Sequence, residues 1–259
     1  MTSTKKSVEF QAKNVKAFRS WLKRFACIDN SLLLEIDEKS SSFIAKSYNE
    51  EHSVIKFSKI NFDDAGLVTK TGKDTKRIKA GIFNIPRLIK IMDQFNDVEF
   101  NLSVNYDEII GNDSKVNYAA KDIQLKNKTL KMCVDCTTLD IFKYITDERF
   151  QTFIQTNAVG EFELSETDIE KLSSLCILDN EHKFIEFKSK DNKVYASGKT
   201  FELLLGEMSG AEAALNVFKN QFSNVDIENY DVKMGEDRLI FTSKDSETVS
   251  VISMAIVEE

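Results

Sequence analysis

The side chains that most often carry catalysis are few in this sequence. Its 259 residues include two histidines, His52 and His182, and both lie in charged, turn-like segments. A histidine that acts as a general base needs a nucleophile and a carboxylate at recognisable spacing. Neither histidine has such partners, so we interpret both as solvated turn residues and predict no catalytic residue and no enzymatic activity.

The four cysteines raise the question of a metal or redox site. Cys133-x-x-Cys136 would need two further ligands to hold zinc, but the sequence has no second C-x-x-C and no H-x-x-x-H. Cys27 and Cys176 lie in apolar helical patterns. The segment 130–134 alternates as a strand does, where a buried cysteine is a small apolar residue. We predict no metal and no cofactor, with a zinc or redox role as the weaker alternative.

A glycine-rich, basic segment superficially resembles a phosphate-binding loop. Five residues rather than four separate Gly66 from Gly72, and Asp74 stands where the magnesium-binding hydroxyl is needed. The segment is better interpreted as a basic loop between two strands, and a solvated loop is favoured over a phosphate contact. Its cations are Lys70, Lys73, Lys76, Arg77 and Lys79.

Composition places the chain among ordinary globular proteins. Apolar residues make up 42% and charged residues 30%, with nineteen phenylalanines and one proline, which favours packed sheets over a loop-rich fold. We find no run of about 18 apolar residues and no apolar signal core, and four cysteines are too few for a disulfide framework. We therefore expect a soluble cytoplasmic protein of two domains that does not enter a membrane. The net charge of −7 argues against nucleic acid covering the whole surface, but it permits one basic face.

The most informative feature is an internal duplication. Residues 33–47 align with 184–198 at an offset of 151, and both segments read as a β-hairpin. A helical stretch precedes each hairpin, ending in Cys27-Ile28-Asp29-Asn30 or in Cys176-Ile177-Leu178-Asp179-Asn180, and a short strand precedes each helix. Each half also contains a second candidate helix, at 84–95 and more weakly at 217–222, followed by alternating strands. We predict an α+β fold with domains at 1–136 and 159–259 and an ordered connector at 137–158.

The first helix has an apolar face and a cationic face. At 100° per residue, Val15, Phe18, Trp21, Leu22 and Phe25 fall within one arc, and Lys16, Arg19 and Lys23 fall opposite them, flanked by Lys13 and Arg24. A solvated face would explain this helix alone. Arg87 and Lys90 on the second helix of the same half favour a sequence-independent surface for a phosphate backbone.

This duplicated order of elements resembles the DNA sliding clamps, most closely the clamp of T-even-like phages and more distantly proliferating cell nuclear antigen. The resemblance extends from about Phe10 to Val257 and is clearest at 159–172 and 215–222. It implies a DNA clamp fold with two similar domains, each with two helices packed on antiparallel sheets. It also implies a homotrimeric ring of six domains that encircles duplex DNA and tethers the replicative DNA polymerase after an ATP-dependent clamp loader has placed it.

The resemblance also implies residue roles. The DNA-facing residues would be Lys13, Lys16, Arg19, Lys23, Arg24, Arg87 and Lys90 in the first domain, with Lys171 and Lys219 in the second. The helix after Ser165 departs from the pattern, because Glu166, Asp168 and Glu170 surround Lys171. Ring closure would pair the edge strand at 130–135 of one subunit with 200–205 of the next.

A hydrophobic pocket for partner peptides is also implied, formed by Ala45, Leu139, Ile141, Phe142, Met254 and Ile256. Ordinary core packing is an equally good interpretation of each of these residues. Two other functions stay open: a clamp-like viral interaction or polymerase accessory protein that forms no ring, and, less favoured, an unrecognised hydrolase.

Overall fold

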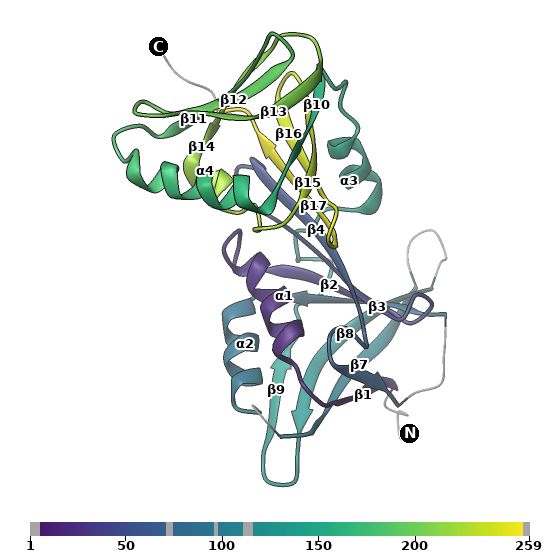
Figure 1. Ribbon diagram of the computed structural model, residues 1–259. Helices are drawn as coiled ribbons and strands as arrows, with labels where there is room; N and C mark the ends of the chain where they lie inside the picture. Colours follow the sequence, from purple (N-terminus) through teal and green to yellow (C-terminus); the bar gives the residue numbers. More distant parts are fainter. Residues whose placement is uncertain (1–5, 71–74, 96–97, 111–115, 256–259) are drawn as a thin grey trace. The chain divides into compact units, whose positions relative to one another are not determined.

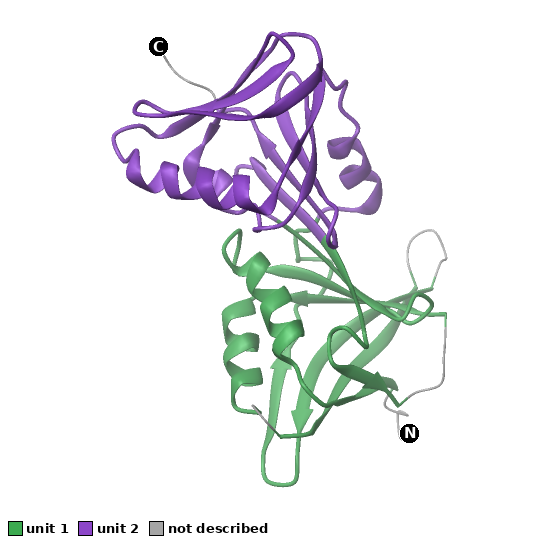
Figure 2. Cartoon of the chain, in the orientation of Figure 1, with its two compact units in different colours: residues 1–47, 58–144 green, residues 48–57, 145–259 purple. Residues whose placement is uncertain are grey.

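The computed structural model describes residues 6–70, 75–95, 98–110 and 116–255 (Figure 1). The chain divides into two compact units (Figure 2). The first unit consists of Met1–Ser47 and Ser58–Tyr144, and the second of Tyr48–Phe57 and Ile145–Glu259. The chain thus passes between the units three times.

The described part of the first unit contains two helices and mostly antiparallel sheet. Its elements in chain order are β1 (Lys6–Ala12), α1 (Lys16–Ala26), β2 (Leu32–Asp37), β3 (Ser42–Tyr48), β4 (Val54–Asn61), β5 (Leu67–Thr69), β6 (Arg77–Ile82), α2 (Ile85–Asp93), β7 (Phe100–Ile110), β8 (Val116–Lys126) and β9 (Lys131–Asp135). β1 pairs with β5 and β7, and β8 lies between β7 and β9. β2 pairs with β3 and β6, and a short parallel pairing joins β6 to β8.

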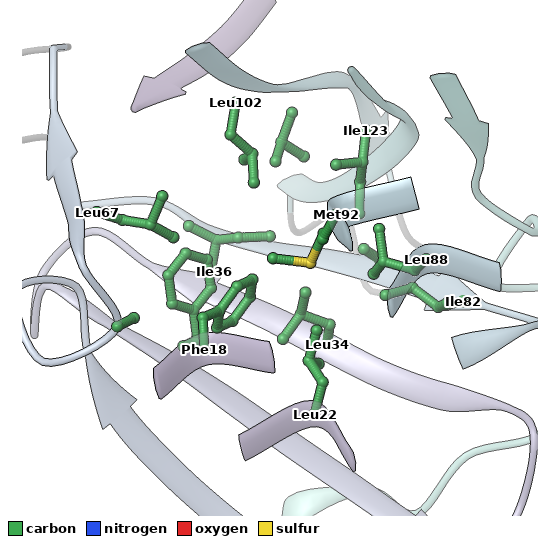
Figure 3. Packing of buried hydrophobic residues seen from close by; sticks show 14 of the residues in the cluster. Phe18, Leu22, Leu34, Ile36, Leu67, Ile82, Leu88, Met92, Leu102 and Ile123 are labelled. Carbon is green, nitrogen blue, oxygen red and sulfur yellow. The ribbon is translucent and has the colours of Figure 1, made fainter. Parts of the chain in front are cut away.

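The predicted apolar arc of α1 forms part of the core of the first unit. Phe18, Trp21, Leu22 and Phe25 are at most 4% exposed and belong to one core cluster with residues of α2 and the strands. Figure 3 shows Phe18 and Leu22 of α1 in this core with Leu34 of β2 and Met92 of α2. Full burial of one large apolar side chain contributes about 1.5–3 kcal/mol, so this arc holds α1 on the sheets with its opposite face outward. Asn84 caps α2 by accepting a hydrogen bond from the Arg87 N–H at 2.8 Å.

The second unit repeats the order. It begins with α3 (Asp147–Ile154) and continues with β10 (Gly160–Leu164), α4 (Glu166–Leu178), β11 (Phe184–Lys190), β12 (Lys193–Ser197), β13 (Glu202–Gly210), β14 (Ala214–Phe218), α5 (Lys219–Phe222), β15 (Tyr230–Met234), β16 (Arg238–Ser243) and β17 (Glu247–Ser253). β10 pairs with β13 and β15, and β16 lies between β15 and β17. β11 pairs with β12 and β14, and β12 with β13. The predicted α+β class and the duplication are confirmed.

Two local predictions need correction. The second helix of the second half was expected over 217–222, but Val217 and Phe218 belong to β14, where they pair with β11, and the helix is one turn, Lys219–Phe222. In the basic segment, Arg77 and Lys79 lie in β6 instead of a loop, because β6 pairs with β2 along Arg77–Ile82. Residues 71–74 of that segment lie outside the described residues.

The connector at 137–158 is divided between the units and does not stand apart. Thr137 donates its N–H to the Gly81 carbonyl at 2.8 Å, and a Cβ at residue 81 would lie 3.0 Å from Cγ of Phe142, so the glycine lets this ring approach β6. Residues 145–158 belong to the second unit and contain α3. There Phe150 is buried and stacks on Phe57, with ring centroids 5.2 Å apart.

Candidate nucleic-acid interface

The helices of the first unit present a basic face. Lys16 and Lys23 of α1 are exposed on the side opposite the buried arc, and Arg87 and Lys90 are exposed on α2. α1 and α2 lie side by side in the first unit (Figure 1). With exposed Lys13, which lies between β1 and α1, these residues define the basic face: Lys13, Lys16, Lys23, Arg87 and Lys90.

Two arginines predicted for this surface are less available. Arg19 forms an ion pair with Asp93 of α2, and its side chain is only 14% exposed. The pair joins α1 to α2, so Arg19 is a packing residue as well as a cation. Arg24 is half-buried. The helical wheel does not reveal this ion pair, because Asp93 lies 74 residues further along the chain, and the DNA-facing role of Arg19 stays a prediction.

The second unit does not reproduce the basic face. On α4, Lys171 is exposed, but Glu166 and Glu170 are exposed as well. Asp168 and Ser165 form a capping box that fixes the start of this helix, which explains the acidic first turn in structural terms.

Lys219, the other cation predicted for the second unit, is held in an internal contact. Its ammonium group lies 2.8 Å from Oδ2 of Asp179 and also donates to the Asp179 carbonyl at the C-terminus of α4. The Lys219 side chain is 13% exposed and that of Asp179 is fully buried. Lys219 therefore stabilises the end of α4 in this structure.

The hydrogen bond from Lys219 is the main reason that the pKa of Asp179 falls from 3.8 to about 2. The backbone N–H of Lys199 and the hydroxyl of Thr200 also donate to this carboxylate, at 2.9 and 3.1 Å. A buried carboxylate that accepts several hydrogen bonds is stabilised in its charged form. Asp179 is thus the charged centre of a local network between α4 and the β12–β13 connection.

The residues predicted for a partner-peptide pocket differ in exposure. Ile141 is 75% and Met254 42% exposed, and Leu139 is half-buried. Ala45 and Phe142 are buried, at 0% and 7% exposure, so in this structure they serve packing. Ile256 lies outside the described residues.

The remaining candidate chemistry has structural explanations. His52 stacks on Tyr48 with ring centroids 4.6 Å apart, and His182 contacts the Phe184 carbonyl through Nδ1 at 3.1 Å. Burial raises the pKa of the Cys136 thiol to about 12, which disfavours the reactive thiolate. Within the described residues, no three His, Cys, Asp or Glu side chains are grouped to hold a metal ion. Nor does any described helix have the length and apolar character needed to cross a bilayer.

Comparison with known proteins gives a consistent result for the fold. No family model and no curated protein sequence matches the chain. Among solved structures, the chain is similar to proliferating cellular nuclear antigen from Entamoeba histolytica, with a TM-score of 0.64, 12% identity and coverage of 96% of this chain and 99% of that one. A. fulgidus PCNA bound to the C-terminal region of FEN-1 gives a TM-score of 0.62 at 9% identity, covering 97% and 100%. A putative DNA polymerase III β subunit from Eubacterium rectale gives 0.65 at 10% identity, covering 96% and 65%.

The chain therefore has the fold of the DNA sliding clamps. The match covers the PCNA chains almost end to end, whereas the chain spans about two thirds of the bacterial β subunit.

Proposed function

We propose that this protein is a DNA sliding clamp, a non-catalytic ring that encircles duplex DNA and tethers the replicative polymerase. The observation that carries the proposal is the basic face of the first unit on a clamp fold. Five exposed cations on neighbouring helices and their approach, in a chain of net charge −7, suit weak contact with phosphates without base recognition.

Internal pairing supports closure of the ring by three copies. β17 pairs with β4, whose residues 54–57 belong to the second unit. In the repeated order of elements β9 corresponds to β17, and the first part of β13 corresponds to β4. Among the described residues β9 pairs with β8 alone, so one edge is available. Pairing of β9 with β13 of the next copy would repeat the β17–β4 arrangement and close six units into a ring.

Partners would then reach the clamp through short segments. The structural neighbours include a Helicobacter pylori β clamp bound to a DNA ligase peptide and the PCNA bound to part of FEN-1. By analogy, Leu139 and exposed Ile141 of the first unit and exposed Met254 of the second are each proposed contacts for segments of the polymerase and an ATP-dependent clamp loader.

The first test is the solution mass across a range of protein concentrations. A trimer has about 88.5 kDa, three times the 29.5 kDa of one chain. A species of this mass that dissociates on dilution supports the ring, and a monomer at every concentration contradicts it and favours the non-ring accessory protein.

The second test is retention on DNA. The loaded protein should slide off linear DNA and persist on circular DNA of the same sequence. The double variant Lys16→Glu/Lys23→Glu should bind duplex DNA more weakly than the wild type and with a shallower salt dependence, because each lost phosphate contact reduces the log–log slope by about 0.9. Lys171→Glu on α4 is compared with Lys16→Glu and Lys23→Glu made singly, since all three carry the same charge change. Equal losses in all three would contradict a DNA contact confined to the basic face.

A further inference from the structure

The second unit contains an acidic groove of about 990 Å³ between β10 and β13. Six carboxylates and two lysines line it, with apolar side chains such as Phe162, Leu164 and Leu205 among them. The charged residues are Glu161, Glu163, Asp168, Glu207, Asp231, Asp245, Lys233 and Lys244. Both lysines already pair with carboxylates of the groove, Lys233 with Glu161 and Lys244 with Glu163 and Asp231.

The first unit fills the equivalent place with its own chain. There the turn between β4 and β5 packs Phe62 against Phe10 of β1, with ring centroids 4.9 Å apart, and buries Ala65. Gly66 completes the turn at φ +74°, and its carbonyl accepts the Lys13 N–H at 3.1 Å. In the second unit β13 continues without such a turn, and its pairing with β10 is limited to Gly160–Phe162. The groove is therefore the space of a missing turn.

The duplication predicts which segment of a second copy approaches this groove. Two series of cross-strand partners start at equivalent positions of β1 and β10 and end at Met132 of β9 and Ser250 of β17. The first series runs from Phe10 through Leu102 and Leu125 to Met132. The second runs from Phe162 through Val232 and Phe241 to Ser250. Lys131 is consequently the counterpart of Val249.

The same comparison relates β13 to β4. The Ser41 carbonyl accepts from the Phe62 N–H as the Asn192 carbonyl accepts from the Met208 N–H, which aligns the two hairpins. The first hairpin keeps its register as far as the Asn49 N–H, which donates to the Val54 carbonyl, whereas β13 has one extra residue opposite Val194 and Tyr195, so Glu202 is the counterpart of Phe57. Within the chain, the Ser253 N–H donates to the Ser53 carbonyl at 2.8 Å, and this antiparallel register places Val249 opposite Phe57. The equivalent register between copies places Lys131 opposite Glu202.

We infer that the acidic groove receives the lysine-rich β8–β9 turn of a second copy of this chain. The inference rests on the proposed ring and specifies its interface. With Lys131 opposite Glu202, the turn at 127–130 runs along β13 toward Leu205 and Glu207, at the mouth of the groove. Lys126, Lys128 and Lys131 are all exposed around this turn, and Glu202 and Glu207 are exposed on β13. Opposite charges thus meet along the whole approach, which fixes the register and accelerates assembly.

The test is a charge swap read by the dissociation of the trimer. Lys131→Glu and Glu202→Lys, each alone, should raise the dissociation constant about tenfold, because like charges then face each other. Lys128→Glu and Glu207→Lys should act in the same direction. The double variant Lys131→Glu/Glu202→Lys should return within about twofold of the wild type, since the pair is restored with its signs exchanged. Glu212→Lys, exposed on the loop after β13 and outside the groove, carries the same charge change and is the control.

Each outcome separates the inference from the ring itself. A wild type that stays monomeric overturns the proposed clamp. A trimeric wild type whose interface variants dissociate no more than Glu212→Lys overturns the docking of the turn and leaves the ring intact. Single variants that weaken the trimer without rescue in the swap overturn the register. The thermal unfolding midpoint of every variant, expected to match that of the wild type, checks that the surface changes leave the fold intact.

Discussion

The buried pair between Lys56 and Asp226 predicts a large, local loss of stability. Lys56 lies in the part of β4 that belongs to the second unit, and its ammonium group lies 3.0 Å from both carboxylate oxygens of Asp226. The Lys56 side chain is fully buried and that of Asp226 is 17% exposed. Replacement by methionine keeps the chain length but removes the charge.

The expected cost follows from this burial. Breaking a buried ion pair by removing one partner costs about 3–5 kcal/mol, because the other charge is left without compensation. Asp226 can still reach water at its exposed edge, so we expect about 2–4 kcal/mol for Lys56→Met. Lys121→Met is the control, since Lys121 and Asp107 form a pair with both side chains more than half exposed, worth about 0–1 kcal/mol.

Urea unfolding at one fixed protein concentration measures the difference. With a slope of about 2–3 kcal/mol per molar urea, the midpoint of Lys56→Met should fall by about 1 M and that of Lys121→Met by a few tenths at most. Lys56→Met/Asp226→Leu should recover part of the loss, because both charges are then absent. Equal midpoints for the two lysine variants would refute the assignment of Lys56 as the charge that holds β4 in the second unit.

Two further predictions concern single residues. Gly66→Ala should destabilise the first unit by more than about 1 kcal/mol, because φ +74° disfavours a Cβ and that atom would meet the Asn14 carbonyl oxygen at 1.7 Å. Calorimetry of the variant and the wild type measures this loss. The stability difference between the wild type and Asp179→Asn should be full above pH 3.8 and shrink as the pH falls toward 2, because the folded pKa of Asp179 is depressed to about 2. Urea midpoints of both proteins measure this difference at each pH. A difference that stays constant between pH 3.8 and pH 2 would show that the Asp179 charge does not contribute to stability.

Periodicity in the sequence predicted the elements that depend on local pattern. The arc of α1 and the Asn84 cap follow from residues within a few positions of one another, and both were confirmed. The connector helix α3 was missed, although Thr146 as N-cap and the spacing of Phe150, Phe153 and Ile154 are typical helix signals.

Long-range partners explain what the sequence did not show. Lys219 looked like a surface cation, but Asp179, 40 residues earlier, holds it at the end of α4. The acidic groove has no sequence signal at all, because it results from the absence of a turn that only the comparison of the two units shows.

The two units therefore share a fold but differ in the charges on equivalent surfaces. In the first unit, cations face outward from α1 and α2, and the gap beside β1 is filled by a turn that includes buried Phe62. In the second unit, acidic residues accompany Lys171 on α4, and Lys219 forms an ion pair with Asp179. The gap equivalent to the one beside β1 is an open acidic groove. In the proposed ring, DNA would meet strongly basic helices in three of six units, which limits the hold on phosphates and favours sliding. The carboxylates of the other three would be directed to the neighbouring subunit, so that closure of the ring and contact with DNA depend on different residues and can be disrupted separately.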